Sequence, residues 1–321
     1  MIGNILGCLL ILLVAVGLIF LVARVARARN SVFKWIGVVL SGLLALLVSA
    51  IAVLAIVGLA KVYIPPAAAP APEVSVANAT PEQIKRGEHL ANAFCASCHS
   101  PTNDLPLVGG VDLGKDSPVP IGSFVSANLT PAGPLKDWTD GQIFRTIRNG
   151  IDRDGKKLFA MSIANGRHLS DEDTLALVAF IRSQPAVENR TQTPPDQPSL
   201  LGLIFGGAGL IPAGEPPGTA VITAPPKGPT AEYGAYILSY QDCRGCHGEQ
   251  LRGADPNSLG PKGPSLLMVK GWTQEQFVTA MRTGVDPSGH TLASQMPWKN
   301  IGRMDDVELA AIHAYLTTAV K

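Results

Sequence analysis

Two short cysteine–histidine motifs hold the residue types in this chain that could do chemistry. Each has two cysteines three residues apart with a histidine directly after them: Cys95, Cys98 and His99, and Cys243, Cys246 and His247. Cysteines on one helical turn can each form a thioether with a vinyl group of haem, and the next histidine can bind the iron. The spacing therefore predicts two covalently attached c-type haems, with His99 and His247 as iron ligands.

A tetrahedral zinc site is the alternative for two C-x-x-C pairs. The pairs are 148 residues apart, and each lies in its own repeat of the chain. This separation favours two haem sites over one zinc site.

The sequence around the first motif is repeated around the second. Trp138 and Trp272 each precede a glycine by twelve residues, and a second glycine follows five residues later in both repeats. A methionine comes next, Met161 in the first repeat and Met296 in the second. The repeat predicts two domains of the same fold.

Helices are expected at both ends of each repeat. The ranges 81–94 and 231–241 should form helices before the haem motifs, and 170–181 and 305–316 should form the closing helices. Ser170 and Asp305 can cap the closing helices, whose first turns are acidic and suit the positive end of the helix dipole. The predicted fold of this part is therefore all-α.

This order of elements, with a methionine ligand after the middle helix, resembles class I cytochrome c. The resemblance covers residues 81–187 and 230–321. It implies that Met161 and Met296 are the sixth ligands of the two irons, and such His/Met ligation raises the reduction potential. Met296-Pro297 matches the family pattern, whereas Met161 is followed by Ser, and His168 is the rival ligand in the first repeat.

The resemblance also implies two structural contacts in each repeat. The first and last helices should cross where a small residue meets an aromatic one, at Gly87 with Phe180 and at Gly234 with Tyr315. A proline carbonyl should accept the second ring N–H of the proximal histidine. Pro264 fits this place in the second repeat, and Pro106 is its loose counterpart in the first.

Four further side chains have two open interpretations. Trp138, Trp272, Arg148 and Arg282 could hydrogen-bond haem propionates, or the tryptophans could pack between helices and the arginines could lie on the solvated surface. The stretch from Asn128 through Asp154-Gly155 also looks like the cytochrome c subunits of membrane-bound alcohol and sugar dehydrogenases. Those subunits usually carry three haems, and this chain has two motifs.

The first 61 residues predict a transmembrane helical hairpin. Two uncharged runs, Ile2 to Ala23 and Trp35 to Ala60, contain 22 and 26 residues. At about 1.5 Å per residue, the shorter run reaches roughly 33 Å and can cross a bilayer core of about 30 Å. The connection from Arg24 to Lys34 carries four basic residues, so it should stay in the cytoplasm. Both haem sites are then placed on the periplasmic side of a bacterial cytoplasmic membrane.

Five segments follow from these patterns. They are a transmembrane hairpin over 1–61, an Ala/Pro linker over 62–80, a first cytochrome c domain over 81–187, a Pro/Gly-rich linker over 188–229 and a second cytochrome c domain over 230–321. The second linker contains the apolar stretch Ser199 to Pro212, which is too short to span a membrane. It should contact either a partner or the membrane surface, or pack between the two domains.

The predicted function is electron transfer by a membrane-anchored dihaem cytochrome c. Irons with two protein ligands leave no position for a substrate, so we expect an electron-transfer subunit rather than an enzyme. The expected partners are membrane-embedded quinol-oxidising or dehydrogenase subunits or a terminal oxidase, together with a soluble electron carrier and the lipid bilayer. A dihaem peroxidase is the alternative, since it also has two C-x-x-C-H motifs but needs one iron that opens to peroxide.

Charge agrees with these partners. Residues 1–61 hold five of the 26 basic residues and no acidic ones, which leaves 21 basic against 25 acidic side chains in the rest. An acidic surface is a poor match for nucleic acid and a fair match for a basic protein partner.

Overall fold

The computed structural model describes residues 2–64, 70–115, 117, 119–189, 196–211, 218–256 and 261–320. It is mostly helical, as predicted, and it divides into two compact units. The first unit contains Met1–Pro66, Val119–Phe124 and Asp196–Ala213, and the second contains the remaining residues with both haem motifs. Each unit is described in turn.

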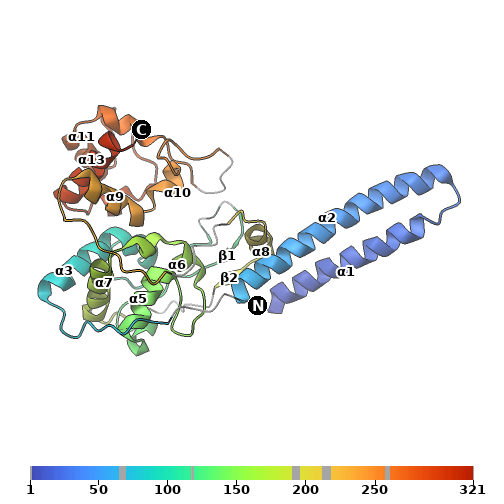
Figure 1. Ribbon diagram of the computed structural model, residues 1–321, viewed down its shortest axis with the longest axis horizontal. Helices are drawn as coiled ribbons and strands as arrows, with labels where there is room; N and C mark the ends of the chain where they lie inside the picture. The colour runs from blue at the N-terminus through green and yellow to red at the C-terminus, as the bar shows by residue number, and fades with distance from the viewer. Residues whose placement is uncertain are drawn as a thin grey trace. The chain divides into compact units, whose positions relative to one another are not determined.

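Two long antiparallel helices make up most of the first unit (Figure 1). They are α1, Ile2–Val25, and α2, Ser31–Tyr63, and the Asn30 side chain caps α2. Large apolar side chains cover their outer surfaces, with Phe20 and Leu46 both 72% exposed. By length and composition, both helices are candidate membrane spans. Helices that are apolar on all sides are unfavourable in water and suit a lipid environment.

A third apolar helix packs against α2. This helix is α8, Leu200–Gly207, and it comes from the stretch whose role the sequence left open. The backbones meet at glycines, because a Cβ on Gly58 would lie 1.9 Å from the carbonyl oxygen of Leu203. A Cβ on Gly207 would lie equally close to the carbonyl oxygen of Leu54. The apolar stretch therefore packs on the hairpin, not between the two repeats.

Two short strands also belong to the first unit, and the second of them directly precedes α8 in the chain. They are β1, Gly122–Ser123, and β2, Gln197–Pro198, and they pair antiparallel. The side chain of Asn4, near the start of α1, donates a 2.7 Å hydrogen bond to the carbonyl of Pro198. The first unit is thus assembled from three separate stretches of chain.

The second unit contains both repeats. The first repeat has α3 Pro81–Leu90, the π-helix η1 Ala91–Cys95, α4 Ala96–His99, η2 Pro134–Asp137, α5 Asp140–Asn149, α6 Phe159–Ile163, η3 Asn165–His168 and α7 Asp171–Ser183. The second has α9 Ala231–Tyr240, α10 Cys243–His247, η4 Leu266–Gly271, α11 Gln274–Thr283, α12 Trp298–Ile301 and α13 Asp306–Thr318. Ser170 and Asp305 cap α7 and α13, as predicted.

The middle helices of the two repeats begin and end in the same way. Thr139 and Thr273 form capping boxes at the starts of α5 and α11, which satisfy backbone amides that have no partner within the helix. Gly150 and Gly284 end these helices with φ of 63° and 71°, a left-handed conformation that favours glycine. The sequence repeat is therefore a structural repeat.

The first and last helices of each repeat cross at a glycine, as predicted. A Cβ on Gly87 would lie 1.9 Å from the carbonyl oxygen of Ala176 and 2.8 Å from the Cβ of Phe180. A Cβ on Gly234 would lie 2.9 Å from the Cβ of Tyr315. Only glycine lets these helices come so close, and this crossing positions the segment that carries each haem motif.

Candidate functional site

The first haem motif lies where η1 passes into α4. Cys95 ends η1, and Cys98 and His99 lie on α4, so the three side chains share one turn and its flanks. The Nδ1 of His99 lies 2.9 Å from the carbonyl oxygen of Ala127. With Nδ1–H donated to this carbonyl, Nε2 is the nitrogen left to bind iron.

The prediction of Pro106 as the acceptor for His99 was wrong. The carbonyl oxygen of Pro106 accepts a 2.9 Å hydrogen bond from the amide of Val108 instead. The segment around Ala127 comes close because Gly109, with φ of 67°, lies against it, and a Cβ there would be 2.4 Å from the carbonyl carbon of Ala127.

The second haem motif forms the short helix α10. The Nδ1 of His247 lies 2.7 Å from the carbonyl oxygen of Pro264, which confirms the predicted acceptor. Gly263 brings this carbonyl to the ring, since a Cβ on it would lie 2.6 Å from Nδ1. The amide of Gly263 also donates to the carbonyl of Cys246 at 2.8 Å, which ties the acceptor strand to the motif. Both histidines thus present Nε2 in the same way.

Burial favours the neutral forms of His99, Cys95 and Cys243. It lowers the pKa of His99, an effect that exceeds the opposing contribution of the Ala127 hydrogen bond. Burial, with smaller contributions from neighbouring groups, raises the pKa of Cys95 and of Cys243 to about 12. A neutral imidazole is the form that binds iron, and a thioether sulfur carries no charge. The residues present therefore fit two covalent haem c groups.

The methionine loops start in the same way in both repeats. The amide of Leu158 donates to the carbonyl of Gly150 at 2.8 Å, and the amide of Leu292 donates to that of Gly284 at the same distance. Met161 follows Leu158 by three residues, in α6, and is half-buried. Met296 follows Leu292 by four residues and is also half-buried.

The sixth ligands stay predictions. Equivalent loops carry Met161 and Met296, but the haem-binding role of either sulfur is not tested by these contacts. The rival ligand His168 is the last residue of η3, and α7 begins three residues later at Asp171.

Arg148 and Arg282 make equivalent contacts that sequence reasoning missed. Arg148 pairs with Asp171 at 2.5 Å, and Arg282 pairs with Asp306 at 3.1 Å. Both carboxylates belong to the first residue of a closing helix, α7 or α13. In these pairs the arginines join the middle helix of each repeat to its last helix. The equal spacing of the two arginines within their repeats is the sequence feature that could have predicted this shared role.

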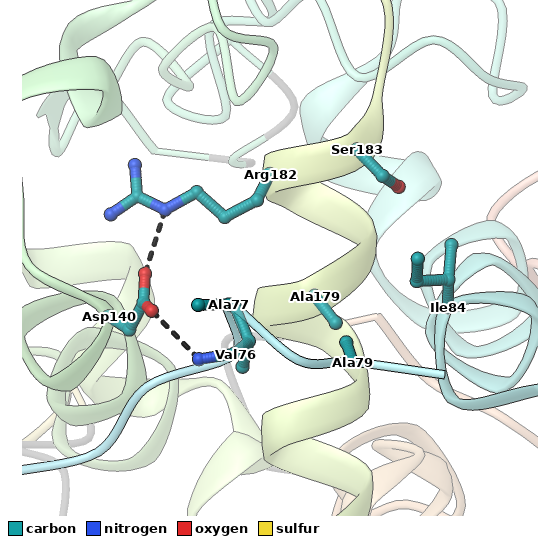
Figure 2. Close-up of a pocket in the computed structure, with 8 residues that line it drawn as sticks. All are labelled: Val76, Ala77, Ala79, Ile84, Asp140, Ala179, Arg182 and Ser183. Carbon is teal, nitrogen blue, oxygen red and sulfur yellow. Dashed lines mark hydrogen bonds and ion pairs between the residues drawn. The ribbon is translucent and has the colours of Figure 1, made fainter. Parts of the chain in front are cut away.

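A shallow hollow of about 400 Å³ lies in the first repeat, away from the haem motif. Figure 2 shows Asp140 between the amide of Val76 and the side chain of Arg182, which it accepts from at 2.9 and 2.8 Å. The lining residues come from 76–84, α5 and α7, and none belongs to either C-x-x-C-H motif. These contacts tie the end of the first linker to the first repeat.

Two families match the two repeats separately. Residues 82–181 match the family described as cytochrome c oxidase, cbb3-type, subunit III. Residues 231–319 match the family described as cytochrome c. The two matched ranges contain both haem motifs.

Three curated relatives resemble parts of the chain. A nicotinate dehydrogenase subunit of Pseudomonas putida is 29% identical over 218 residues, which cover 64% of this chain and 17% of the relative. The cytochrome c subunit of the quinone alcohol dehydrogenase of Gluconobacter oxydans is 34% identical over 101 residues, 30% of this chain and 20% of the relative. A dihaem c-type cytochrome of Cereibacter sphaeroides is 32% identical over 113 residues, 34% of this chain and 37% of the relative. The matches thus span 17% to 37% of these relatives' own lengths.

Proposed function

Because this chain belongs to the cytochrome c family and carries two cytochrome c domains with two covalent haems, we propose that it is a membrane-anchored electron relay. It passes single electrons on the outer face of the cytoplasmic membrane, as a subunit of a respiratory or photosynthetic complex. The observation that carries this proposal is the pair of equivalent haem motifs, each with its histidine Nδ1 bonded to a backbone carbonyl.

The proposed ligands are His99 with Met161 and His247 with Met296. Bound haem supplies a reversible one-electron iron couple. The hydrogen bond from Nδ1 to a backbone carbonyl fixes the tautomer of each histidine. In this proposal the methionine loops would supply the second ligand of each iron. An iron with two protein ligands has no open position, which favours electron transfer over the peroxidase alternative.

The hairpin is proposed to anchor the domains in the membrane. α1 and α2 have 24 and 33 residues, or roughly 36 and 50 Å at the helical rise, against a bilayer core of about 30 Å. The basic connection between them supports a cytoplasmic turn. The proposed division is the hairpin over 1–61, linkers over 62–80 and 188–229, and haem domains over 81–187 and 230–321.

The proposed electron donor is a dehydrogenase or quinol-oxidising subunit in the membrane. Two of the relatives carry the names of dehydrogenase subunits, which supports this class of partner. A soluble carrier or a terminal oxidase is the proposed acceptor.

Spectroscopy of the purified chain tests the function directly. We expect two haems per chain, both reduced and reoxidised reversibly, with no rapid binding of CO or cyanide and no turnover of peroxide. Rapid ligand binding at one haem together with peroxide turnover would replace the relay with the peroxidase alternative. Protease treatment of spheroplasts tests the topology, because both haem domains should be digested from outside.

A further inference from the structure

We propose that the two haem domains are locked together by a buried polar interface built from equivalent residues of the two repeats, so that electrons pass between the haems without domain motion. The residues that carry this interface are Arg86, His89 and Asp173 of the first repeat and Tyr236 and Glu308 of the second. The inference rests on the proposed function and specifies how its two haem sites are coupled.

The interface residues occupy matching positions. His89 and Tyr236 each follow the crossing glycine of their first helix by two residues, and Asp173 and Glu308 are each the third residue of a closing helix. The Nε2 of His89 lies 2.5 Å from Oε2 of Glu308. The hydroxyl of Tyr236 donates to Oδ2 of Asp173 at 2.7 Å. Each first helix therefore binds the closing helix of the other repeat, which is the reciprocity of a two-fold related dimer.

Arg86 lies at the centre of this interface. Its Nε is 2.8 Å from Oδ1 of Asp173 in its own repeat, and its Nη1 is 2.7 Å from Oε1 of Glu308 in the other. Glu308 is only 1% exposed and Asp173 6%. Buried carboxylates are costly unless they are paired and hydrogen-bonded. Arg86 and His89 therefore offset the cost of burying Glu308 in the docked arrangement, and removing one partner of these pairs while the others stay buried would destabilise it.

A second layer of contacts reaches the haem motifs themselves. The rings of Phe94 and Tyr240 meet edge to face with centroids 5.9 Å apart, and Phe94 directly precedes Cys95. The side chain of Gln241 donates to the carbonyl of Ala93 at 3.3 Å. The chain segments that lead into the two haem motifs thus touch each other across the interface.

The segments after the methionine loops repeat this reciprocity. Asn165, in η3, donates to Asp242 at 3.0 Å, and Asn300, in α12, donates to the carbonyl of Asn92 at 3.1 Å. Asp242 and Asn92 both lie within three residues of the first cysteine of a haem motif. Each methionine loop is therefore followed by a residue that contacts the haem-motif segment of the other domain. The interface thus holds both haem-motif segments.

The test uses the full-length holoprotein and two readouts. Flash reduction measures the rate at which an electron redistributes between the haems, in buffers of increasing glycerol viscosity. Hydrogen–deuterium exchange over 91–95 and 239–241 measures opening of the interface independently of electron transfer. The variants are Glu308→Gln, which removes the charge, and Tyr236→Phe, a milder change that removes one hydroxyl. The control is Asp140→Asn, which weakens an ion pair within the first repeat.

We expect the wild-type rate to be independent of viscosity and the exchange to be slow. In Glu308→Gln, the open population should rise on the order of a hundredfold, as expected when a buried charged pair is broken. Its electron redistribution should become viscosity-dependent, and Tyr236→Phe should show the same change to a smaller extent. Asp140→Asn should match the wild type in both readouts.

Fast exchange over 91–95 in the wild type, or a wild-type rate that falls with viscosity, would overturn the lock. The exchange readout decides this even where the haems fail to cycle. Failure to cycle would overturn the proposed relay instead, so the two failures are distinguishable.

Discussion

Backbone carbonyls, not side chains, orient the histidines of both haem motifs. The acceptors are Ala127 for His99 and Pro264 for His247, at 2.9 and 2.7 Å. A ring whose Nδ1–H is donated keeps one tautomer and one orientation, which is the usual way a metal-binding histidine is prepared. Gly109 and Gly263 allow these carbonyls to approach, so both glycines help to position the histidine rings.

Gly263→Ala should impair the second haem site selectively. The new methyl group would lie 2.6 Å from Nδ1 of His247, so either the ring or the acceptor strand must move. We expect a loss of about 1–3 kcal/mol of stability, typical of overpacking, and a shifted potential for the second haem only. Chemical denaturation and redox titration measure both effects. Gly271→Ala is the matched control, because nothing lies within 4 Å of a Cβ at that position.

Met161→Ala should abolish the near-infrared sulfur-to-iron charge-transfer band of the first haem and leave that of the second. Loss of the sulfur ligand should also lower the reduction potential of the first haem. Met281→Leu is the control, since Met281 is buried in α11 and 4% exposed. An unchanged spectrum of the Met161 variant would exclude this residue as the ligand.

At the scale of single residues, the sequence predicted the features that depend on side-chain type. It missed the hydrogen-bond acceptor that a backbone carbonyl provides. The motif spacing predicted the attachment residues, and Gly263-Pro264 predicted the acceptor that the structure shows for His247. Ala127 has no side-chain signal for its role, because any residue has a carbonyl. The sequence alone did not identify the partner of Arg148. The fold shows that Arg148 and Arg282, at equivalent positions of the two repeats, each pair with the first residue of a closing helix.

At the scale of helices, the crossing of the first and last helices sets the geometry of each repeat. Gly87 and Gly234 let the first and last helices of each repeat meet at their backbones, as the resemblance to class I cytochrome c implied. Caps and helix starts were also predictable, because Ser170 and Asp305 are side chains with a local function. The packing of α8 on the hairpin was not predictable, since an apolar helix fits several apolar surfaces equally well.

Gly87→Ala should destabilise the first domain. Alanine would gain about 1 kcal/mol in helix propensity, but its Cβ would lie 1.9 Å from the carbonyl oxygen of Ala176. The helices must separate, and we expect the overpacking to cost about 3 kcal/mol and to outweigh the propensity gain. The free energy of unfolding measured by denaturant titration should fall. A stability equal to or above that of the wild type would contradict the close crossing.

The pairing of the two repeats depends on long-range contacts that no local sequence pattern predicts. Arg86, Asp173 and Glu308 are separated by up to 222 residues in sequence, yet they form one cluster. Each looks in the sequence like an ordinary helix-surface or helix-start residue. Only the pairing of the two repeats gives these residues their common role.

Acid should weaken this cluster. Burial raises the pKa of Glu308, but hydrogen bonds and charges from His89 and Arg86 outweigh burial and lower it to about 2, against 4.5 for a free glutamate. A carboxyl whose folded pKa is depressed stabilises the fold fully above the unfolded pKa and loses that contribution as pH falls towards the folded pKa. We therefore expect about 3 kcal/mol of stability to be lost between pH 4.5 and 2.

Glu308→Gln should remove most of this dependence. The free energy of unfolding, measured across pH 6 to 2 for the wild type and the variant, checks it. The groups that face Glu308 are Arg86, His89, Lys227 and Asp305, with Tyr233 and Tyr240 further away. The same slope in both proteins would assign the acid sensitivity to another group.

The packing of α8 on α2 determines which residues must be removed or replaced to obtain a water-soluble form of this protein. Deleting the hairpin alone would remove the cover of α8 and expose Leu203, now 1% accessible, together with the face around Gly207 that packs on α2. Such a truncated chain should precipitate or bind detergent even with both haems attached. A soluble version should therefore replace residues 196–211 with a polar spacer in the same step that removes residues 1–61.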